Sequence, residues 1–230
     1  MPRALLVHGL NSNPQNWWRV AGWLEADGWA VETATLLGHD HRPPASRYAL
    51  SAYTDDLLAQ APGPWDLVIA HSLGGSAATI AASLSPDWTR RLVLVDPVWL
   101  IPEAERGAVI ADQVAELALT RETLAAAKPH WHPDDIAAKL AAVAAVDPAA
   151  AHRTFEETPG WDLSAAARSL PVPTLVLAGD PAVYSILQPE LAREVAALDP
   201  LVEIRVIAGA GHSPHRDEPD ATRVALRSWL

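Results

Sequence analysis

The stretch LVIAHSLGGSAA, residues 67–78, decides the fold of this chain. Four apolar residues lead into His71 and Ser72, two glycines follow shortly after, and the sequence then becomes rich in alanine. A short apolar run that meets small residues in this way predicts a buried strand, a sharp turn and the start of a helix. Ser72 lies at the corner of that turn, so the rest of the chain must indicate whether its hydroxyl takes part in chemistry.

The same alternation of apolar runs and amphipathic stretches extends along most of the chain. We expect strands at residues 4–7, 30–34, 67–70, 92–95, 174–178 and 202–207. We expect helices at residues 16–27, 51–60, 73–83, 189–198 and 220–230. Strands that alternate with helices pair in parallel and are covered on both faces. The sequence therefore predicts an α/β fold, with a mostly parallel six-stranded sheet flanked by helices.

The alternation stops between residues 98 and 169. This segment contains no good strand, and its stretches AERGAVIADQVAELAL, PDDIAAKLAAVAAV and DPAAAHRTFEET are all typical of helices. We therefore expect a core of residues 1–97 and 170–230, with residues 98–169 inserted as a helical cap.

The composition limits the partners and the compartment. The chain has 230 residues, of which 50% are hydrophobic, a formal net charge of −11 and no cysteine. Nucleic acids and anionic membranes require clustered positive charge, so neither is expected as a partner. No segment has the roughly 18 to 20 apolar residues of a membrane helix or the pattern of a signal peptide. The absence of cysteine fits a reducing compartment, and we expect a cytoplasmic protein.

Ser72 occupies the centre of the pattern Ala70-His71-Ser72-Leu73-Gly74. A serine at a strand-to-helix turn, with small residues two positions before and after it, is typical of a nucleophile elbow. The small residues are needed because the serine backbone is strained and the strand and helix pass close together. A plain glycine-rich turn gives a similar pattern, and that alternative stays open on these five residues alone.

Two further stretches place histidines at strand ends, where sites form in parallel sheets. LLVHGLNSNPQNW puts His8 and Gly9 after the first strand, and AGAGHSPHRDEP puts His212 after the last. The remaining pieces are TLLGHD at 35–40, AHSLGG at 70–75, LVLVDPV at 92–98 and PTLVLAGD at 173–180. In this order, the pieces closely resemble the α/β-hydrolase superfamily over almost the whole chain. That family usually has two more strands before the His-Gly strand, so the resemblance implies a trimmed, six-stranded version.

The resemblance implies a role for several of these residues. Ser72 would attack a carbonyl carbon and His212 would take its proton, because a serine hydroxyl is a poor nucleophile without an adjacent base. The backbone N–H groups of Leu10 and Leu73 would form the oxyanion hole.

The third member of the triad is where the sequence departs from the family. The usual acid stands three residues after the glycine that ends a late strand, here Gly179, but that position is Ala182, which cannot orient a histidine. Either Asp180 takes the role in a shortened loop, or the acid is Asp96, after the preceding strand. We favour Asp180, because Asp-Pro after a strand is ordinary turn chemistry and accounts for Asp96.

Tryptophans are expected to shape the substrate pocket. Trp99 and Trp131 fall in the predicted cap and Trp17 follows the His-Gly loop, so we predict that these three contact an apolar substrate. Burial in the core is the competing interpretation for each of them, because the chain has ten tryptophans. No metal or cofactor is expected, because the pairs His130/His132 and His39/His41 lack a third ligand.

The sequence thus predicts a cofactor-free serine hydrolase that cleaves a small, largely apolar carboxylic ester or lactone through a Ser72 acyl-enzyme. The alternatives are a lyase similar to hydroxynitrile lyases, in which the same serine and histidine move a proton, and a binding protein that holds a small ligand without turnover.

Overall fold

The computed structural model describes all 230 residues and contains one six-stranded sheet. The strand order is β2-β1-β3-β4-β5-β6, and every neighbouring pair is parallel. The strands are β1 (Arg3–Val7), β2 (Ala30–Ala34), β3 (Leu67–His71), β4 (Leu92–Val95), β5 (Thr174–Ala178) and β6 (Val202–Val206). The predicted fold class is confirmed, and each predicted strand boundary lies within one residue of the observed one.

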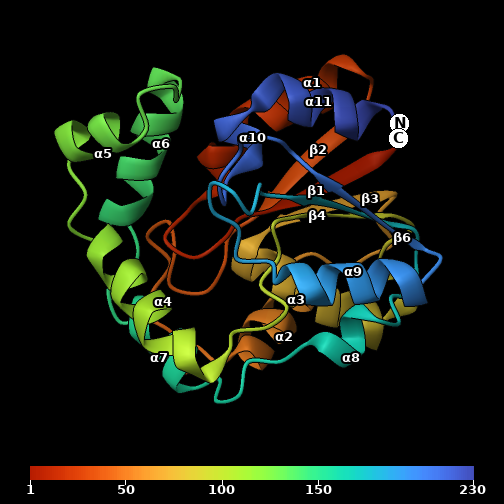
Figure 1. Ribbon diagram of the computed structural model, residues 1–230, viewed down its shortest axis with the longest axis horizontal. Helices are drawn as coiled ribbons and strands as arrows, with labels where there is room; N and C mark the ends of the chain where they lie inside the picture. The colour runs from red at the N-terminus through yellow and green to blue at the C-terminus, as the bar shows by residue number, and fades with distance from the viewer.

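Helices cover both faces of the sheet (Figure 1). One face is covered by η1 (Pro14–Trp17), α1 (Trp18–Ala26), α10 (Pro214–Asp217) and α11 (Pro219–Arg227). The other is covered by α2 (Leu50–Gln60), α3 (Ser72–Leu84), η2 (Pro86–Trp88) and α9 (Pro189–Leu198). Because side chains of a strand alternate between faces, Leu6 packs in the first layer and Leu5 in the second. The inner strands β1, β3, β4 and β5 are therefore buried on both sides, which explains their continuous apolar sequences.

The helical segment between β4 and β5 consists of α4 (Glu103–Glu116), α5 (Arg121–Ala127), α6 (Pro133–Ala144), α7 (Ala150–Glu156) and α8 (Ser164–Ala167). Local signals set these helices: Thr120 and Thr123 form a capping box at the start of α5, and Pro133 is the first residue of α6. Helices α4 to α7 stand to one side of the sheet, whereas α8 returns to contact α3 (Figure 1).

The strand order reverses at β1, because the chain passes from β1 to β2 on one side and then to β3 on the other. Ligands of open parallel sheets bind at such a point, outside the carboxyl ends of the strands. The loops after β1, β3, β4 and β6 all reach this edge of the sheet. None of the helices in the chain combines the length and the apolar character needed to cross a membrane.

Candidate active site

Ser72 is the first residue of α3 and directly follows β3. Its φ is +52°, in the left-handed region that non-glycine residues seldom adopt, so the turn is strained as an elbow requires. Helix α3 passes very close to the end of β1: a Cβ on Gly74 would lie 2.3 Å from the carbonyl oxygen of His8. Only glycine fits at position 74, which explains the small residue in the sequence pattern.

The loop after β1 also touches the elbow. A Cβ on Gly9 would lie 2.9 Å from the Cβ of Ser72, so this glycine allows the backbone of the loop to approach the serine. Leu10 and Leu73, whose N–H groups were predicted as oxyanion donors, line the same cavity as Ser72. The N–H of Leu73 belongs to the first turn of α3, where backbone donors have no acceptor inside the helix.

His212, in the loop after β6, lies between Ser72 and Asp96. The Ser72 Oγ and the His212 Nε2 are 2.9 Å apart, and the His212 Nδ1 is 2.6 Å from Asp96 Oδ2. A carboxylate can only accept, so Nδ1–H donates to Asp96 and leaves Nε2 to accept from the serine hydroxyl. The three side chains form one continuous chain of hydrogen bonds from a fully buried carboxylate to the hydroxyl.

The structure corrects the expected position of Asp180. Its carboxylate accepts from the backbone N–H groups of Ala182 and Gly209, both at 2.9 Å, and does not contact His212. The hydrogen bond from Gly209, and to a smaller extent that from Ala182, lowers the pKa of Asp180. Gly179, at the start of the loop after β5, packs against the backbone of Gly211. The carboxylate of Asp180 instead closes a turn by accepting from the N–H of Ala182.

Asp96, the alternative acid, is the carboxylate that contacts His212. It follows β4 with a φ of +41° and is completely buried. Besides His212, its oxygens accept from the N–H of Gly179, the N–H of Ile186 and the hydroxyl of Ser185. A buried carboxylate with so many donors is held in one orientation, as the partner of a histidine must be.

Three other buried histidines, His8, His39 and His71, lie on or beside the loops that carry the site. The His71 Nε2–H donates to the carbonyl oxygen of His212 at 2.8 Å and so holds the loop that carries His212. Burial, with the neighbouring charges of His212 and His215, lowers the pKa of His71 well below its usual value. Burial and the nearby His39 lower the pKa of His8 to about 3, and burial lowers that of His39 to about 4. The sequence contained no signal for the supporting role of His71.

Asp217 is a second buried acid that sequence reasoning missed. Its Oδ1 accepts from the Trp131 indole N–H at 2.7 Å, and its Oδ2 accepts from the N–H of Gly211 at 2.9 Å. Burial opposes the charge of this carboxylate, but the hydrogen bond from Trp131 and the charge of Lys128 lower its pKa on balance. Asp217 thus ties the helical segment to the residue that precedes His212.

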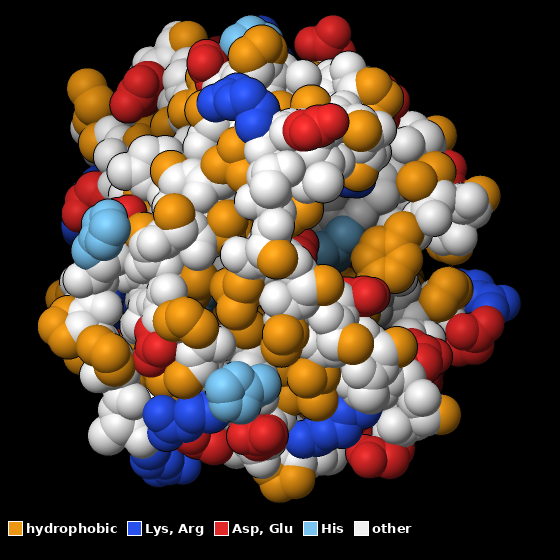
Figure 2. All heavy atoms as spheres, turned by 90° about the vertical axis from the view of Figure 1, so that its left-hand side faces the viewer, with side chains coloured by type: hydrophobic (Ala, Val, Ile, Leu, Met, Phe, Trp, Pro, Cys, Tyr) orange, Lys and Arg blue, Asp and Glu red, His pale blue; other side chains and the backbone are white.

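The cavity above Ser72 has a volume of about 420 Å³, within the range typical of small-molecule sites. Its apolar walls come from the helical segment and from the loop after β5: Val98, Ile101, Val109, Trp131, Phe155, Trp161, Val183, Tyr184 and Ile186. Figure 2 shows the face formed by the helical segment, with a hollow in which a histidine side chain is visible beside hydrophobic side chains.

Of the three tryptophans predicted to contact substrate, only Trp131 lines this cavity. Trp99 is fully buried and its indole N–H donates to Thr79 Oγ1 at 3.0 Å. Trp17 is buried on the opposite face of the sheet and stacks on His215, with ring centroids 4.7 Å apart. The predicted substrate contacts of Trp99 and Trp17 are therefore wrong. At both positions the large apolar indole ring is buried in the core instead. Phe155 and Trp161 line the cavity instead.

The histidines that were considered as metal ligands have other partners. His39 Nε2 accepts from the N–H of Asn11 at 3.1 Å, next to Leu10, while His41 is exposed. His130 Nε2 lies 3.3 Å from Asp217, and His132 accepts from the N–H of Asp134 at the start of α6.

Comparison with known proteins places these features in a family. The sequence model described as the alpha/beta hydrolase family matches residues 4–225. The sn-1-specific diacylglycerol lipase ABHD11 of Mus musculus is 29% identical over 259 residues, which cover 100% of this chain and 81% of that protein. Among solved structures, E-2-(acetamidomethylene)succinate hydrolase has a TM-score of 0.83 at 22% identity, over 99% of this chain and 91% of the other. The esterase EaEST from Exiguobacterium antarcticum has a TM-score of 0.80 at 16% identity, over 100% and 91%.

Proposed function

Because this chain belongs to the alpha/beta hydrolase family, we propose that it is a serine hydrolase that cleaves a small carboxylic ester or lactone through an acyl-enzyme on Ser72. The observation that carries the proposal is the chain of hydrogen bonds from Asp96 through His212 to Ser72. Esterases and a lipase among the similar proteins support ester cleavage over the lyase and binding alternatives.

In this proposal the reaction has two steps. His212 Nε2 takes the hydroxyl proton while Ser72 Oγ forms a bond to the carbonyl carbon, and the same proton then passes to the leaving alcohol as its C–O bond breaks. Water attacks the resulting acyl-enzyme, His212 takes a proton from the water, and that proton returns to Ser72 Oγ as the acid leaves. Asp96 fixes the tautomer of His212 and stabilises the imidazolium that forms in both steps.

The oxyanion is proposed to lie against the N–H groups of Leu10 and Leu73. Both residues line the cavity, and the approach of Gly9 to Ser72 brings the first of them to the elbow. Each such donor contributes about 3 to 4 kcal/mol to stabilisation of the transition state.

We further propose that the helical segment, residues 98–169, acts as a cap that shapes the pocket. It contributes Val98, Ile101, Trp131 and Phe155 to the cavity wall. An apolar wall favours a largely apolar acyl or alcohol group, because such a group loses its contact with water on binding.

Labelling with a fluorophosphonate probe, together with turnover of p-nitrophenyl esters, tests the proposed function. We expect one label per chain, absent in Ser72→Ala, and a loss of kcat on the order of 10⁶-fold in that variant. Ser83→Ala is the matched control, because Ser83 is an exposed serine on the same helix. Unchanged ester turnover in Ser72→Ala would exclude the serine mechanism, and labelling of wild type without any ester turnover would favour the lyase.

A further inference from the structure

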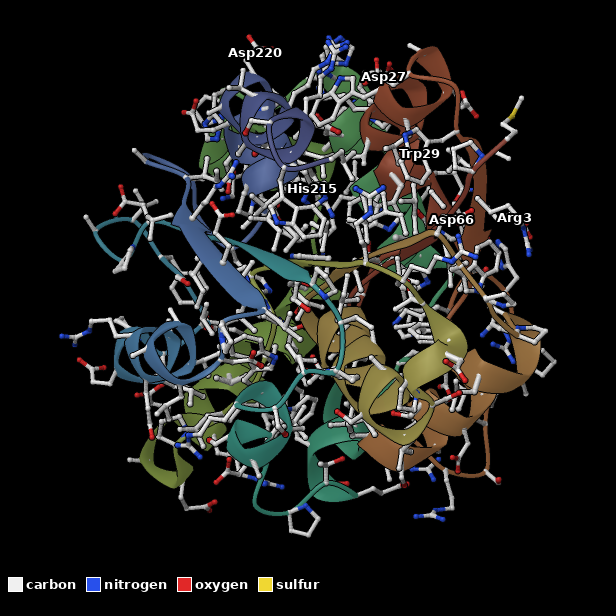
Figure 3. The ribbon with its side chains drawn as sticks, turned by 90° about the vertical axis from the view of Figure 1, so that its right-hand side faces the viewer. Arg3, Asp27, Trp29, Asp66, His215 and Asp220 are labelled. Carbon is white, nitrogen blue, oxygen red and sulfur yellow. The ribbon has the colours of Figure 1, made fainter.

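Arg216 is a buried cation in the wall of the candidate active site. It lies on α10, four residues after His212, and only 4% of its surface is exposed. Its side chain lines the same cavity as Ser72 and His212. Figure 3 labels the adjacent residue His215 and shows it on the inner side of the C-terminal helices, facing the sheet.

The guanidinium of Arg216 has few partners within the protein. Its Nε donates to His215 Nε2 at 3.3 Å, and its two terminal nitrogens donate to no protein acceptor. Its Cζ lies 4.9 Å from the centroid of the Trp131 ring, so a cation–π contact holds the plane of the group. Two donor-bearing nitrogens in a wall of the cavity are thus left for a ligand.

The carboxylates around Arg216 are already neutralised by other cations. Three short ion pairs account for them: Lys139 with Glu116 at 2.6 Å, Lys128 with Asp217 at 3.2 Å and Arg19 with Asp135 at 2.9 Å. Asp112, the remaining acid on the cavity wall, is exposed and forms no ion pair with Arg216. Arg216 is therefore a buried cation of the site without an ion-pair partner of its own.

A buried cation without an ion-pair partner is costly, because the desolvation of the guanidinium is only partly offset. Burial lowers the pKa of Arg216, although Asp135, Glu116 and Asp217 act in the opposite direction. An anion in the cavity would offset this desolvation. A guanidinium matches a planar carboxylate with two parallel hydrogen bonds.

We propose that Arg216 binds a carboxylate of the substrate, at the far end from the ester bond that Ser72 attacks. The inference rests on the proposed function and specifies its substrate class: a monoanionic ester or lactone with an apolar carbon skeleton and a free carboxylate. The apolar wall of Val98, Ile101 and Phe155 contacts the skeleton. One unpaired cation matches one negative charge, which favours a carboxylate over a doubly charged phosphate.

The test compares two esters of the same carbon chain, mono-p-nitrophenyl glutarate and its methyl ester, in which the distal carboxylate is free or capped. The measured quantity is the ratio of their kcat/KM values within each variant, so that a general loss of active protein cancels. We expect wild type to prefer the free carboxylate, and Arg216→Gln to reduce the ratio on the order of 10²-fold. Arg216→Lys should give a ratio between those of Arg216→Gln and wild type, because lysine keeps the positive charge but cannot form the two parallel hydrogen bonds of a guanidinium. Arg227→Gln, on the surface of α11, removes the same charge and should keep the wild-type ratio.

A measurement on wild type alone covers the case in which the variants do not fold. Glutaramate, which carries a single carboxylate, should inhibit hydrolysis of the capped ester and slow fluorophosphonate labelling, whereas the neutral glutaramide at the same concentration should not. Hydrolysis of both esters without preference for the carboxylate would overturn the role of Arg216 and leave the proposed function standing. Inhibition by inorganic phosphate but not by glutaramate would equally overturn it. If neither ester is hydrolysed and Ser72 is not labelled, the proposed function itself fails.

Discussion

The carboxylate of Asp96 is held in place by four hydrogen-bond donors. Its oxygens accept from two backbone N–H groups, from Ser185 and from His212, and it is shielded completely from solvent. Asp180, by contrast, accepts only from backbone N–H groups of its own turn and of the loop after β6. These two aspartates therefore provide a matched pair for testing which acid supports His212.

We expect Asp96→Asn to lower kcat for a p-nitrophenyl ester on the order of 10⁴-fold, because an amide can donate to Nδ1 and thereby favours the wrong tautomer of His212. Asp180→Asn should keep kcat close to that of wild type and affect mainly the turn. Circular dichroism and thermal unfolding of both variants would show whether the fold is retained. Near-normal turnover in Asp96→Asn, with a large loss in Asp180→Asn, would contradict the assignment made from the geometry.

The sequence could indicate the serine and the histidine of this site but not the acid. Ser72 follows an apolar strand with Ala70 and Gly74 two positions away, and His212 lies in the small-residue loop AGAGHS after the last strand, which are local signals. The acid depends on which of two loops reaches His212 in space, and the positive φ that directs Asp96 inward is not visible in an Asp-Pro pair. Arg216 was invisible for a similar reason, since an arginine on a short polar helix looks like a surface residue until its burial is known.

At the scale of elements, the position of Ser72 depends on how closely the start of α3 packs against the end of β1. The crowded position is Gly74, where a Cβ would also lie 2.8 Å from the carbonyl oxygen of Val7. Gly22, in the middle of α1, has no atom within 4 Å of the corresponding position. The same substitution at these two glycines therefore has opposite consequences for the stability of the fold.

We expect Gly74→Ala to destabilise the protein by about 3 kcal/mol, because backbone atoms must move to accept the methyl group. Gly22→Ala should stabilise it by roughly 1 kcal/mol through helix propensity. For a chain of this size these changes correspond to a Tm lower by about 6 to 12 °C and higher by about 2 to 4 °C. Thermal unfolding of the two variants would measure both, and a Tm for Gly74→Ala equal to that of wild type would show that the contact is looser than the geometry indicates.

The elements themselves were largely predictable, because alternation of strand and helix is a local property of the sequence. The six strands and the helices on both faces follow from the alternation of apolar runs with amphipathic stretches. The positions of Trp17 and Trp99 were not predictable in this way. An indole ring satisfies the hydrophobic pattern equally in a core and in a pocket wall, and only the packing of β-sheet and helices separates the two.

For the molecule as a whole, burial of neutral histidines couples stability to pH. His8, His39, His71 and His215 are all buried, and burial lowers the pKa of each. A histidine in the unfolded chain titrates at about 6.5. Between that pH and the lower folded value, the unfolded state binds a proton that the folded state does not bind. Stability from these groups is therefore complete above about pH 6.5 and is lost as the pH falls towards their folded pKa values.

We expect the free energy of unfolding to decrease on acidification from pH 7 to pH 5, with a slope that approaches about 1.4 kcal/mol per pH unit below pH 6.5 for each histidine that stays neutral in the folded state. His39→Gln should reduce this slope by the contribution of one histidine, because the pKa of His39 in the folded protein is about 4. His41→Asn serves as the control, since His41 is exposed and asparagine tolerates its φ of +61°. Urea unfolding at several pH values measures the slope. An unfolding free energy that stays constant from pH 7 to pH 5 in wild type would mean that the buried histidines take up protons without leaving the folded state.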